Sequence, residues 1–333
     1  MRRVVGRIIA AIEVSRLSIA FGAVANVWLM VLLARADSRL SATAVAQAPL
    51  WEVLVAGALV AIGFLAFGAA LNDFLDAKHD RAFAPERPLP AGSFAPRRAM
   101  QLAAASLCLG LLGSVAFGTA SVLAALALAA TILVYDAFAK HVPAFGIVLA
   151  GLSTALSMLV PSVATYSTAP IWLAMTQTMG VGALAYVVGE KRPRLTRRSI
   201  ALGAFGWIFW TAVLAGIEYA RNDGALLVSF EDPTHLALPA ATAVVGGLLC
   251  VWKLGSARLA DGGRGFQRGS RASERVLRYG SLWKSLVAAA WLTAADMPAA
   301  AAWIAGIAVL VFLLVAFVRE AGPQLSEPIG WRS

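Results

Sequence analysis

The sequence predicts an all-α integral membrane protein, built as a bundle of about nine transmembrane helices. Of its 333 residues, 60% are hydrophobic and only 14% are charged. A typical soluble domain is about half apolar and about a quarter charged. The apolar residues also form uncharged runs of the ~20 residues that a helix needs to cross a bilayer. A separate soluble domain is therefore excluded, and residues 1–333 are predicted to form a single transmembrane domain.

Apolar runs define the predicted helices in chain order. They cover residues 17–34, 53–71, 99–139, 142–164, 171–188, 199–217, 236–252 and 299–318. The run 99–139 is twice too long for one helix, and the Gly-Thr-Ala-Ser stretch at 118–121 favours a tight connection that divides it. Segment 278–297 would supply a tenth helix if the amine of Lys284 extends to the interface, so nine and ten helices both stay open. Residues 253–284 are predicted to form a flexible, basic cytoplasmic loop.

The charge pattern indicates a membrane rather than a nucleic acid as the surroundings. The net charge is +10, but the basic residues lie between the apolar runs. A cytoplasmic N-terminus places most of them in cytoplasmic loops, as the positive-inside rule requires, where they can contact anionic lipid headgroups. We therefore predict a protein of the bacterial inner membrane with its N-terminus and its polar clusters on the cytoplasmic side. No nucleic-acid partner and no protein partner is predicted.

The two cysteines exclude two further kinds of site. Cys108 and Cys250 both lie inside long apolar runs. Neither a disulfide framework nor a thiolate metal cluster can be built from them.

The strongest functional signal is a set of carboxylates at the end of the second predicted helix. Asp73, Asp76 and Asp80 are spaced i, i+3, i+7, so a continuing helix presents all three along one face, with Asn72 beside them. Three like charges repel one another, and each is costly to dehydrate at a membrane helix end. Mg²⁺ removes this conflict, since it binds carboxylate oxygens and keeps other positions for phosphates. The pattern predicts a site for Mg²⁺ and a diphosphate.

Basic residues follow these carboxylates closely. Arg81 and Arg87 add positive charge, and an arginine can form paired hydrogen bonds with a phosphate group. A solvated helix end or a cation-coupled transporter are weaker interpretations, because three carboxylates in phase are a specific pattern and transporter sites lie nearer the bilayer midplane. Phosphotransfer to a lipid alcohol is disfavoured by the absence of DG and AR elements around residues 73–80.

These residues resemble the UbiA superfamily of intramembrane prenyltransferases. The resemblance rests on the NDxxDxxxD pattern at 72–80 and the RPLPxG pattern at 87–92. It implies about nine helices around a cavity open to lipid. It also implies transfer of a prenyl group from a prenyl diphosphate to an aromatic or lipid-like acceptor, with Mg²⁺ held by Asp73, Asp76 and Asp80. The partners implied are a prenyl diphosphate, a hydrophobic acceptor and membrane lipids.

The chain departs from the superfamily where a second aspartate-rich motif is expected. Residues 180–198 contain one carboxylate, Glu190, which is followed at once by Lys191 and Arg192. With an intact first cluster, a Tyr-Asp pair followed by a lysine and a weakened second cluster, the chain resembles the divergent branch of the superfamily found in bacterial ebo-type gene clusters. Three outcomes stay open: Lys191 and Arg192 replace a second metal as phosphate contacts, the chain binds a lipid diphosphate without transfer, or another carboxylate completes the metal shell.

Asp136 is the candidate for that further carboxylate. It ends the fourth predicted helix on the cytoplasmic side, and Lys140 follows one turn later, where the two can also pair with each other. Tyr186 can face the cavity and stabilise a cation with its ring. Asn26, in the first helix, is a buried amide that needs partners in lipid and can contact either another helix or the substrate. The leading hypothesis is a prenyltransferase, and the alternative is a non-catalytic isoprenoid or lipid-diphosphate carrier.

Overall fold

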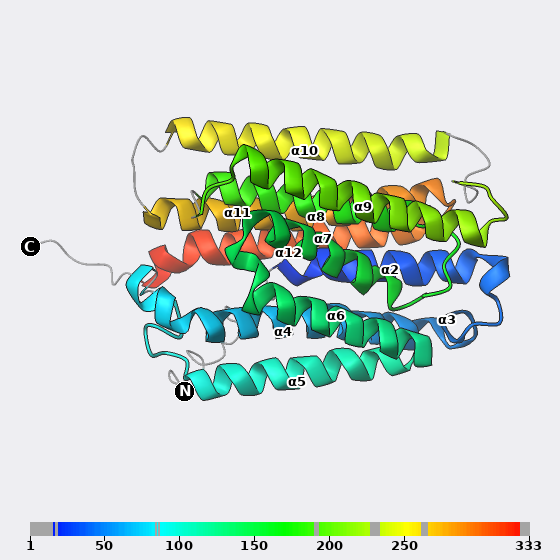
Figure 1. Cartoon of the computed structure of the whole chain (residues 1–333), viewed down its shortest axis with the longest axis horizontal. Coiled ribbons are helices and arrows are strands. Elements are labelled where there is room, and N and C mark those ends of the chain that lie inside the picture. Colours follow the sequence, from blue (N-terminus) through cyan, green and yellow to red (C-terminus); the bar gives the residue numbers. More distant parts are fainter. Residues whose placement is uncertain are drawn as a thin grey trace, which may run out of the picture.

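The protein is a bundle of long helices (Figure 1). This computed structural model describes residues 16, 19–83, 85, 87–189, 193–226, 234–260 and 266–326, without the side chains of residues 83, 234, 253–260, 266–272, 274 and 318–326. Within these residues the regular structure is helical, with no strand. The long helices are α2 (Ala20–Ala36), α4 (Leu50–Phe83), α5 (Pro96–Val115), α6 (Thr119–Ala137), α7 (Pro143–Leu159), α8 (Ala169–Val188), α9 (Arg197–Arg221), α10 (Thr234–Ala260), α11 (Phe266–Ala294) and α12 (Pro298–Ser326). Shorter elements are η2 (Ser38–Leu40), α3 (Ala44–Gln47) and η3 (Ala139–His141).

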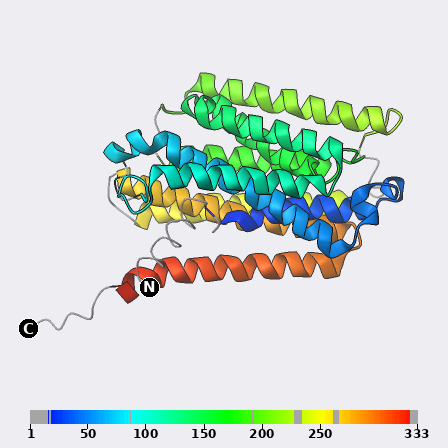
Figure 2. The same cartoon turned by 90° about the horizontal axis from the view of Figure 1, so that it is seen from below.

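Most of these helices suit a membrane, which confirms the predicted fold class. Within the described residues, 7 helices are long and apolar enough to cross a bilayer, namely those in α4, α5, α6, α8, α9, α10 and α12. Helices α2 and α7 are shorter but also apolar. Viewed from below, α12 runs along one side of the bundle, where it packs against α11 (Figure 2). The chain is an integral membrane protein.

The long apolar run is divided where the sequence predicted. Helix α5 ends at Val115 and α6 begins at Thr119. Gly118, the residue before α6, has φ +99°, a backbone conformation that residues other than glycine rarely adopt. This single glycine therefore turns one 41-residue apolar stretch (residues 99–139) into two antiparallel helices.

The prediction of a flexible loop at residues 253–284 is wrong, because the described part of this segment is helical. Helix α10 continues to Ala260, and α11 begins at Phe266. Leucine, alanine and arginine favour helix in this segment, and Gly280 lets α11 approach α8 closely: a Cβ there would lie 2.7 Å from a Val181 methyl group. Segment 278–297 thus lies largely within α11, a long helix that packs against α2, α8, α10 and α12.

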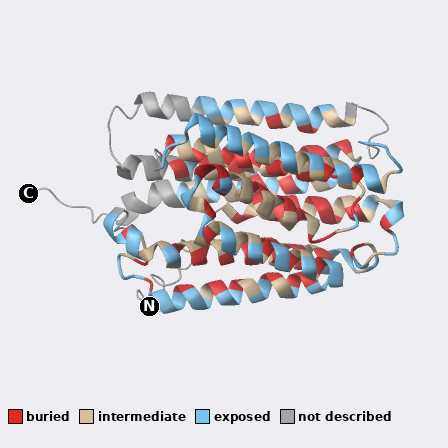
Figure 3. Ribbon diagram, viewed as in Figure 1, coloured by how far each residue is buried: buried red, intermediate tan, exposed pale blue. Residues whose placement is uncertain are grey.

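The two largest apolar clusters hold most of the bundle together, and the buried residues line its interior (Figure 3). One cluster joins α4, α5 and α6 and includes the buried Phe64 and Leu128. The other joins α2, α7, α8 and α11, where Met158 and Leu292 are fully buried. Both clusters are apolar, and the carboxylates Asp73 and Asp80 lie toward the end of α4, after the cluster residues Phe67, Ala70 and Leu71.

Candidate active site

Helix α4 carries the predicted carboxylates. It continues without a break to Phe83, so Asp73, Asp76 and Asp80 share one helix. Asp73 and Asp80 are buried, with 8% and 6% exposure. Among the described residues, no three acidic, histidine or cysteine side chains form a ready metal cage. Each of these aspartates instead lies beside a basic side chain that comes from outside α4.

Asp76 is paired with Lys140, which follows α6. The Lys140 Nζ atom donates to Asp76 Oδ1 at 2.7 Å and to Asn72 Oδ1 at 3.2 Å. Asn72 and Asp76 are one turn apart on α4, so a single amine contacts both. The sequence allowed Lys140 to pair with Asp136, but the described contacts of its amine are to α4.

Asp80 is paired with Arg87 from the turn after α4. Arg87 Nη1 donates to Asp80 Oδ2 at 2.7 Å. The turn is closed by hydrogen bonds from Ala91 N to Arg87 O at 2.9 Å and from Phe94 N to Pro88 O at 3.0 Å. Burial acts to lower the pKa of the Arg87 guanidinium, but the Asp80 carboxylate outweighs it, so the pKa is raised. The RPLPAG turn therefore holds a fully charged guanidinium against α4.

Asp73 faces Arg16, which precedes α2. The distance from Arg16 Nη2 to Asp73 Oδ1 is 3.9 Å. Arg16 has φ +50°, the left-handed region that few residues with a side chain occupy. Arg16 was not among the predicted site residues, because nothing in the sequence indicates which helix it meets.

Asp136 and Tyr135, at the end of α6, belong to the same site as the α4 carboxylates. Asp136 is 2% exposed, and its Oδ2 atom has no hydrogen-bond partner among the described residues. This oxygen lies against α4, 3.8 Å from where a Cβ of Gly68 would be. The Tyr135 hydroxyl interacts electrostatically with Asp136, Arg16 and Tyr186.

These electrostatic interactions connect the end of α6 with Arg16, with Asp76 of α4 and with Tyr186 of α8. Tyr135 was not among the predicted site residues, although it directly precedes Asp136 in the sequence.

Other predicted residues lie elsewhere. Arg81 is exposed at the end of α4. Asn26 is buried in α2 and its Nδ2 atom has no partner among the described residues. Two residues further along α2, Trp28 Nε1 donates to Leu54 O of α4 at 2.7 Å, so this part of α2 lies beside Leu54. Asp73 lies roughly 28 Å further along α4 than Leu54. Asn26 is therefore remote from the carboxylates. The predicted phosphate contacts Glu190, Lys191 and Arg192 lie outside the described residues.

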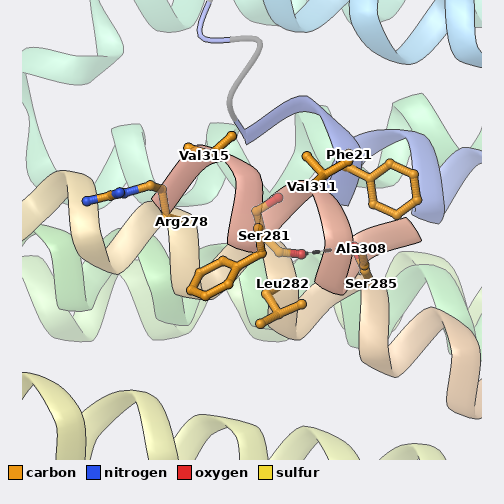
Figure 4. A pocket seen from close by; sticks show the side chains of 9 residues that line it. Phe21, Arg278, Ser281, Leu282, Ser285, Ala308, Val311 and Val315 are labelled. Atoms are coloured by element: carbon orange, nitrogen blue, oxygen red, sulfur yellow. Dashed lines mark hydrogen bonds between the residues drawn. The ribbon is translucent and has the colours of Figure 1, made fainter. Parts of the chain in front are cut away.

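A small hollow lies away from these carboxylates, between α2, α11 and α12 (Figure 4). Its empty space, including the part that is open to the surroundings, is about 290 Å³. Phe21 of α2, Ser281 and Arg278 of α11 and Phe312 of α12 are among the side chains that line it. Its lining contains no carboxylate, so it does not extend the acidic site.

The chain matches one protein family. The model of the UbiA prenyltransferase family matches residues 38–262, which is more than half of the chain. A digeranylgeranylglyceryl phosphate synthase of Ignicoccus hospitalis is 36% identical over 119 residues, which make up 35% of this chain and 39% of that protein. The chain therefore spans well under half the length of this curated relative.

Solved structures show the same fold. One from work on digeranylgeranylglyceryl phosphate synthase in membranes has a TM-score of 0.56 and 16% identity, and the match covers 89% of this chain and 98% of that one. A UbiA homologue from Archaeoglobus fulgidus bound to Cd²⁺ has a TM-score of 0.50 and 16% identity, with 83% and 99% covered. These likenesses confirm the predicted architecture.

Proposed function

The chain belongs to the UbiA prenyltransferase family, and from this membership we propose that it transfers a prenyl group from a prenyl diphosphate to a hydrophobic acceptor, with Mg²⁺ as cofactor. The observation that carries the proposal is the meeting of three carboxylates and three basic side chains at one end of the bundle. Asp76 pairs with Lys140, Asp80 with Arg87, and Asp73 faces Arg16.

The donor chemistry of this site fits Mg²⁺. Carboxylate and amide oxygens are the ligands that this hard cation takes, and Asp73, Asp76, Asp80 and Asn72 supply them. Asp136 offers a further carboxylate oxygen that is buried and has no hydrogen-bond partner among the described residues. When bound, Mg²⁺ would neutralise the charge that develops on the leaving pyrophosphate.

The basic side chains would bind the diphosphate. Lys140, Arg87 and Arg16 now lie against carboxylates, and each can exchange that partner for a phosphate oxygen of the substrate. Such an exchange keeps every charge paired, which limits the cost of carrying them at a membrane helix end. The allylic C–O bond then breaks with its electron pair on the pyrophosphate, and the positive charge of these side chains stabilises that leaving group.

The surrounding bundle would hold the isoprenoid tail. Tyr135 and Tyr186 lie at the ends of α6 and α8, where an aromatic ring can stabilise an allylic cation. Apolar helices behind them exclude water, which would otherwise capture that cation. We propose an aromatic or lipid-like acceptor, and the curated relative is named for a product built on a glycerol phosphate lipid. The alternative of a non-catalytic carrier is not favoured, because the matching family is described as a prenyltransferase family and the curated relative is named as a synthase.

The orientation is also part of the proposal. The positive-inside rule supports a cytoplasmic N-terminus and an active site that opens to the cytoplasm of a bacterial cell. The basic residues that follow α4, α6 and α8 in the sequence are the observation behind it.

Pyrophosphate release tests the proposal. The full-length protein in lipid nanodiscs would receive Mg²⁺, prenyl diphosphates of several lengths and a panel of aromatic and lipid acceptors. We expect release that requires an acceptor and falls by about 10²–10³-fold in Asp73→Asn. Glu52→Gln, at the opposite, exposed end of α4, is the matched control and should keep full activity. Saturable binding of prenyl diphosphate without release from any acceptor would instead establish a carrier.

A further inference from the structure

We infer that Ser281, on α11, is a positioning residue that holds Arg16 at the candidate active site. The inference rests on the proposed function in one respect, because Arg16 is taken there to contact the diphosphate. Ser281 lies beyond residues 38–262, the part of the chain that matches the family. Its contacts join α11 to the first turn of α2.

The Ser281 hydroxyl makes two hydrogen bonds to that turn. Its Oγ atom donates to Ile19 O at 2.8 Å and accepts from Gly22 N at 3.0 Å. Ser281 and Phe21, the neighbour of Gly22, both line the hollow (Figure 4). One side chain therefore holds both a carbonyl and an amide at the start of α2.

These bonds replace a cap that α2 lacks. The first amides of an α-helix have no partner within the helix and usually receive a side-chain oxygen from the residue at its N-cap. The N-cap of α2 is Ile19, whose side chain cannot accept a hydrogen bond. Ser281 supplies the missing oxygen from 259 residues further along the chain.

Gly22 makes this approach possible. A Cβ at Gly22 would lie 2.5 Å from Ser281 Oγ and 2.8 Å from Ser281 O, too close for any side chain. The neighbouring Ser285 is a natural comparison, because the hydrogen bond described for its Oγ atom runs to Ser281 O within α11, at 3.1 Å (Figure 4). Loss of that hydroxyl leaves the bonds to α2 in place.

The capped turn leads directly to the active site. Ile19 N donates to Arg16 O at 3.0 Å, so the residue that Ser281 holds also holds Arg16. Arg16 is in the left-handed region, φ +50°, which persists only where surrounding contacts fix it. From that turn its guanidinium reaches Asp73, at 3.9 Å. Without the Ser281 hydroxyl, the turn loses the bonds that direct Arg16 toward the carboxylates.

A double-mutant cycle tests this role. The full-length protein in nanodiscs would be compared as wild type, Ser281→Ala, Arg16→Ala and the double variant, with Ser285→Ala as control and Ser281→Thr as the conservative replacement. The first readout is the Kd for geranyl diphosphate in the presence of Mg²⁺. The second is hydrogen exchange of the peptide that spans residues 16–24, which is independent of the proposed function.

We expect Ser281→Ala to weaken binding by about fivefold and to speed exchange in this peptide, while Ser285→Ala changes neither. Ser281→Thr should restore part of the binding. In the Arg16→Ala background, Ser281→Ala should have no further effect on Kd. An equal loss in both backgrounds, or faster exchange with unchanged Kd, would overturn the inference. If wild-type protein and Asp73→Asn both fail to bind geranyl diphosphate, the proposed function fails. The hydrogen-exchange data then decide by themselves whether Ser281 caps α2, because unchanged exchange in Ser281→Ala would exclude that cap.

Discussion

The Lys140 amine lies 2.7 Å from an Asp76 carboxylate oxygen, although the two residues are 64 positions apart in the sequence. This ion pair is mostly buried, with 11% of the Lys140 side chain and 24% of the Asp76 side chain exposed. It joins the end of α4 to the turn after α6 at the point where the carboxylates gather. A lysine in this position can serve either Asp76 or a phosphate group of the substrate.

Lys140→Met should therefore weaken diphosphate binding. We expect the Kd for geranyl diphosphate with Mg²⁺ to rise about 10- to 100-fold, because a buried positive charge that can contact phosphate is lost. Lys78→Met, which removes an exposed lysine from α4, is the control and should leave the Kd unchanged. Calorimetric titration of the protein in nanodiscs measures both. Equal affinities for the two variants would contradict a phosphate contact for Lys140.

Arg87 and Arg81 should differ, although the sequence places both near the carboxylates. Arg87→Met leaves the buried Asp80 carboxylate without its described hydrogen bond. We therefore expect the free energy of unfolding to fall by about 1–2 kcal/mol. This value is already reduced for solvent screening, because the Arg87 side chain is partly exposed. Arg81→Met removes an exposed side chain and should cost less than about 0.5 kcal/mol. Thermal unfolding in nanodiscs separates the two, and the reverse order would contradict the observed pairing.

Asp136→Asn tests the further carboxylate. If Asp136 completes the metal shell, its loss should raise the Mg²⁺ concentration needed for half-maximal pyrophosphate release by about tenfold or more. The amide keeps the shape of the side chain, and the Glu52→Gln variant provides the matched change in charge. An unchanged Mg²⁺ dependence would remove Asp136 from the metal site and leave Asp73, Asp76 and Asp80 as the ligands.

Close packing of α4 against α5 predicts a further effect on stability. A Cβ at Gly63 would lie 2.5 Å from the backbone nitrogen of Gly110, so Gly63→Ala should force the helices apart and cost about 1–3 kcal/mol. Gly203 of α9 has nothing within 4 Å of its Cβ position, and Gly203→Ala should leave stability unchanged or raise it slightly. Unfolding measured for both variants in nanodiscs checks this difference.

Local patterns were enough to predict much of the fold. Apolar runs of membrane-spanning length predicted the helices, and the glycine at 118 predicted the division between α5 and α6. The spacing of Asp73, Asp76 and Asp80 predicted one acidic helix end, because helical periodicity is a property of neighbouring residues. The basic stretch 253–284 was the exception, since its low hydropathy hid a helix that packs against four others.

Tertiary structure alone decided which charges meet. By sequence, Lys140 was a partner for Asp136 one turn away, whereas in the structure its amine contacts α4. Arg16 reaches Asp73, and Ser281 caps α2, across separations that no periodic pattern records. The physical reason is that a helix fixes the directions of its own side chains, while its neighbours are chosen by packing across the whole bundle. The sequence by itself therefore determined a membrane bundle with an acidic helix end, and the packing of α2, α4, α6, α8 and α11 decided how that end is built into a site.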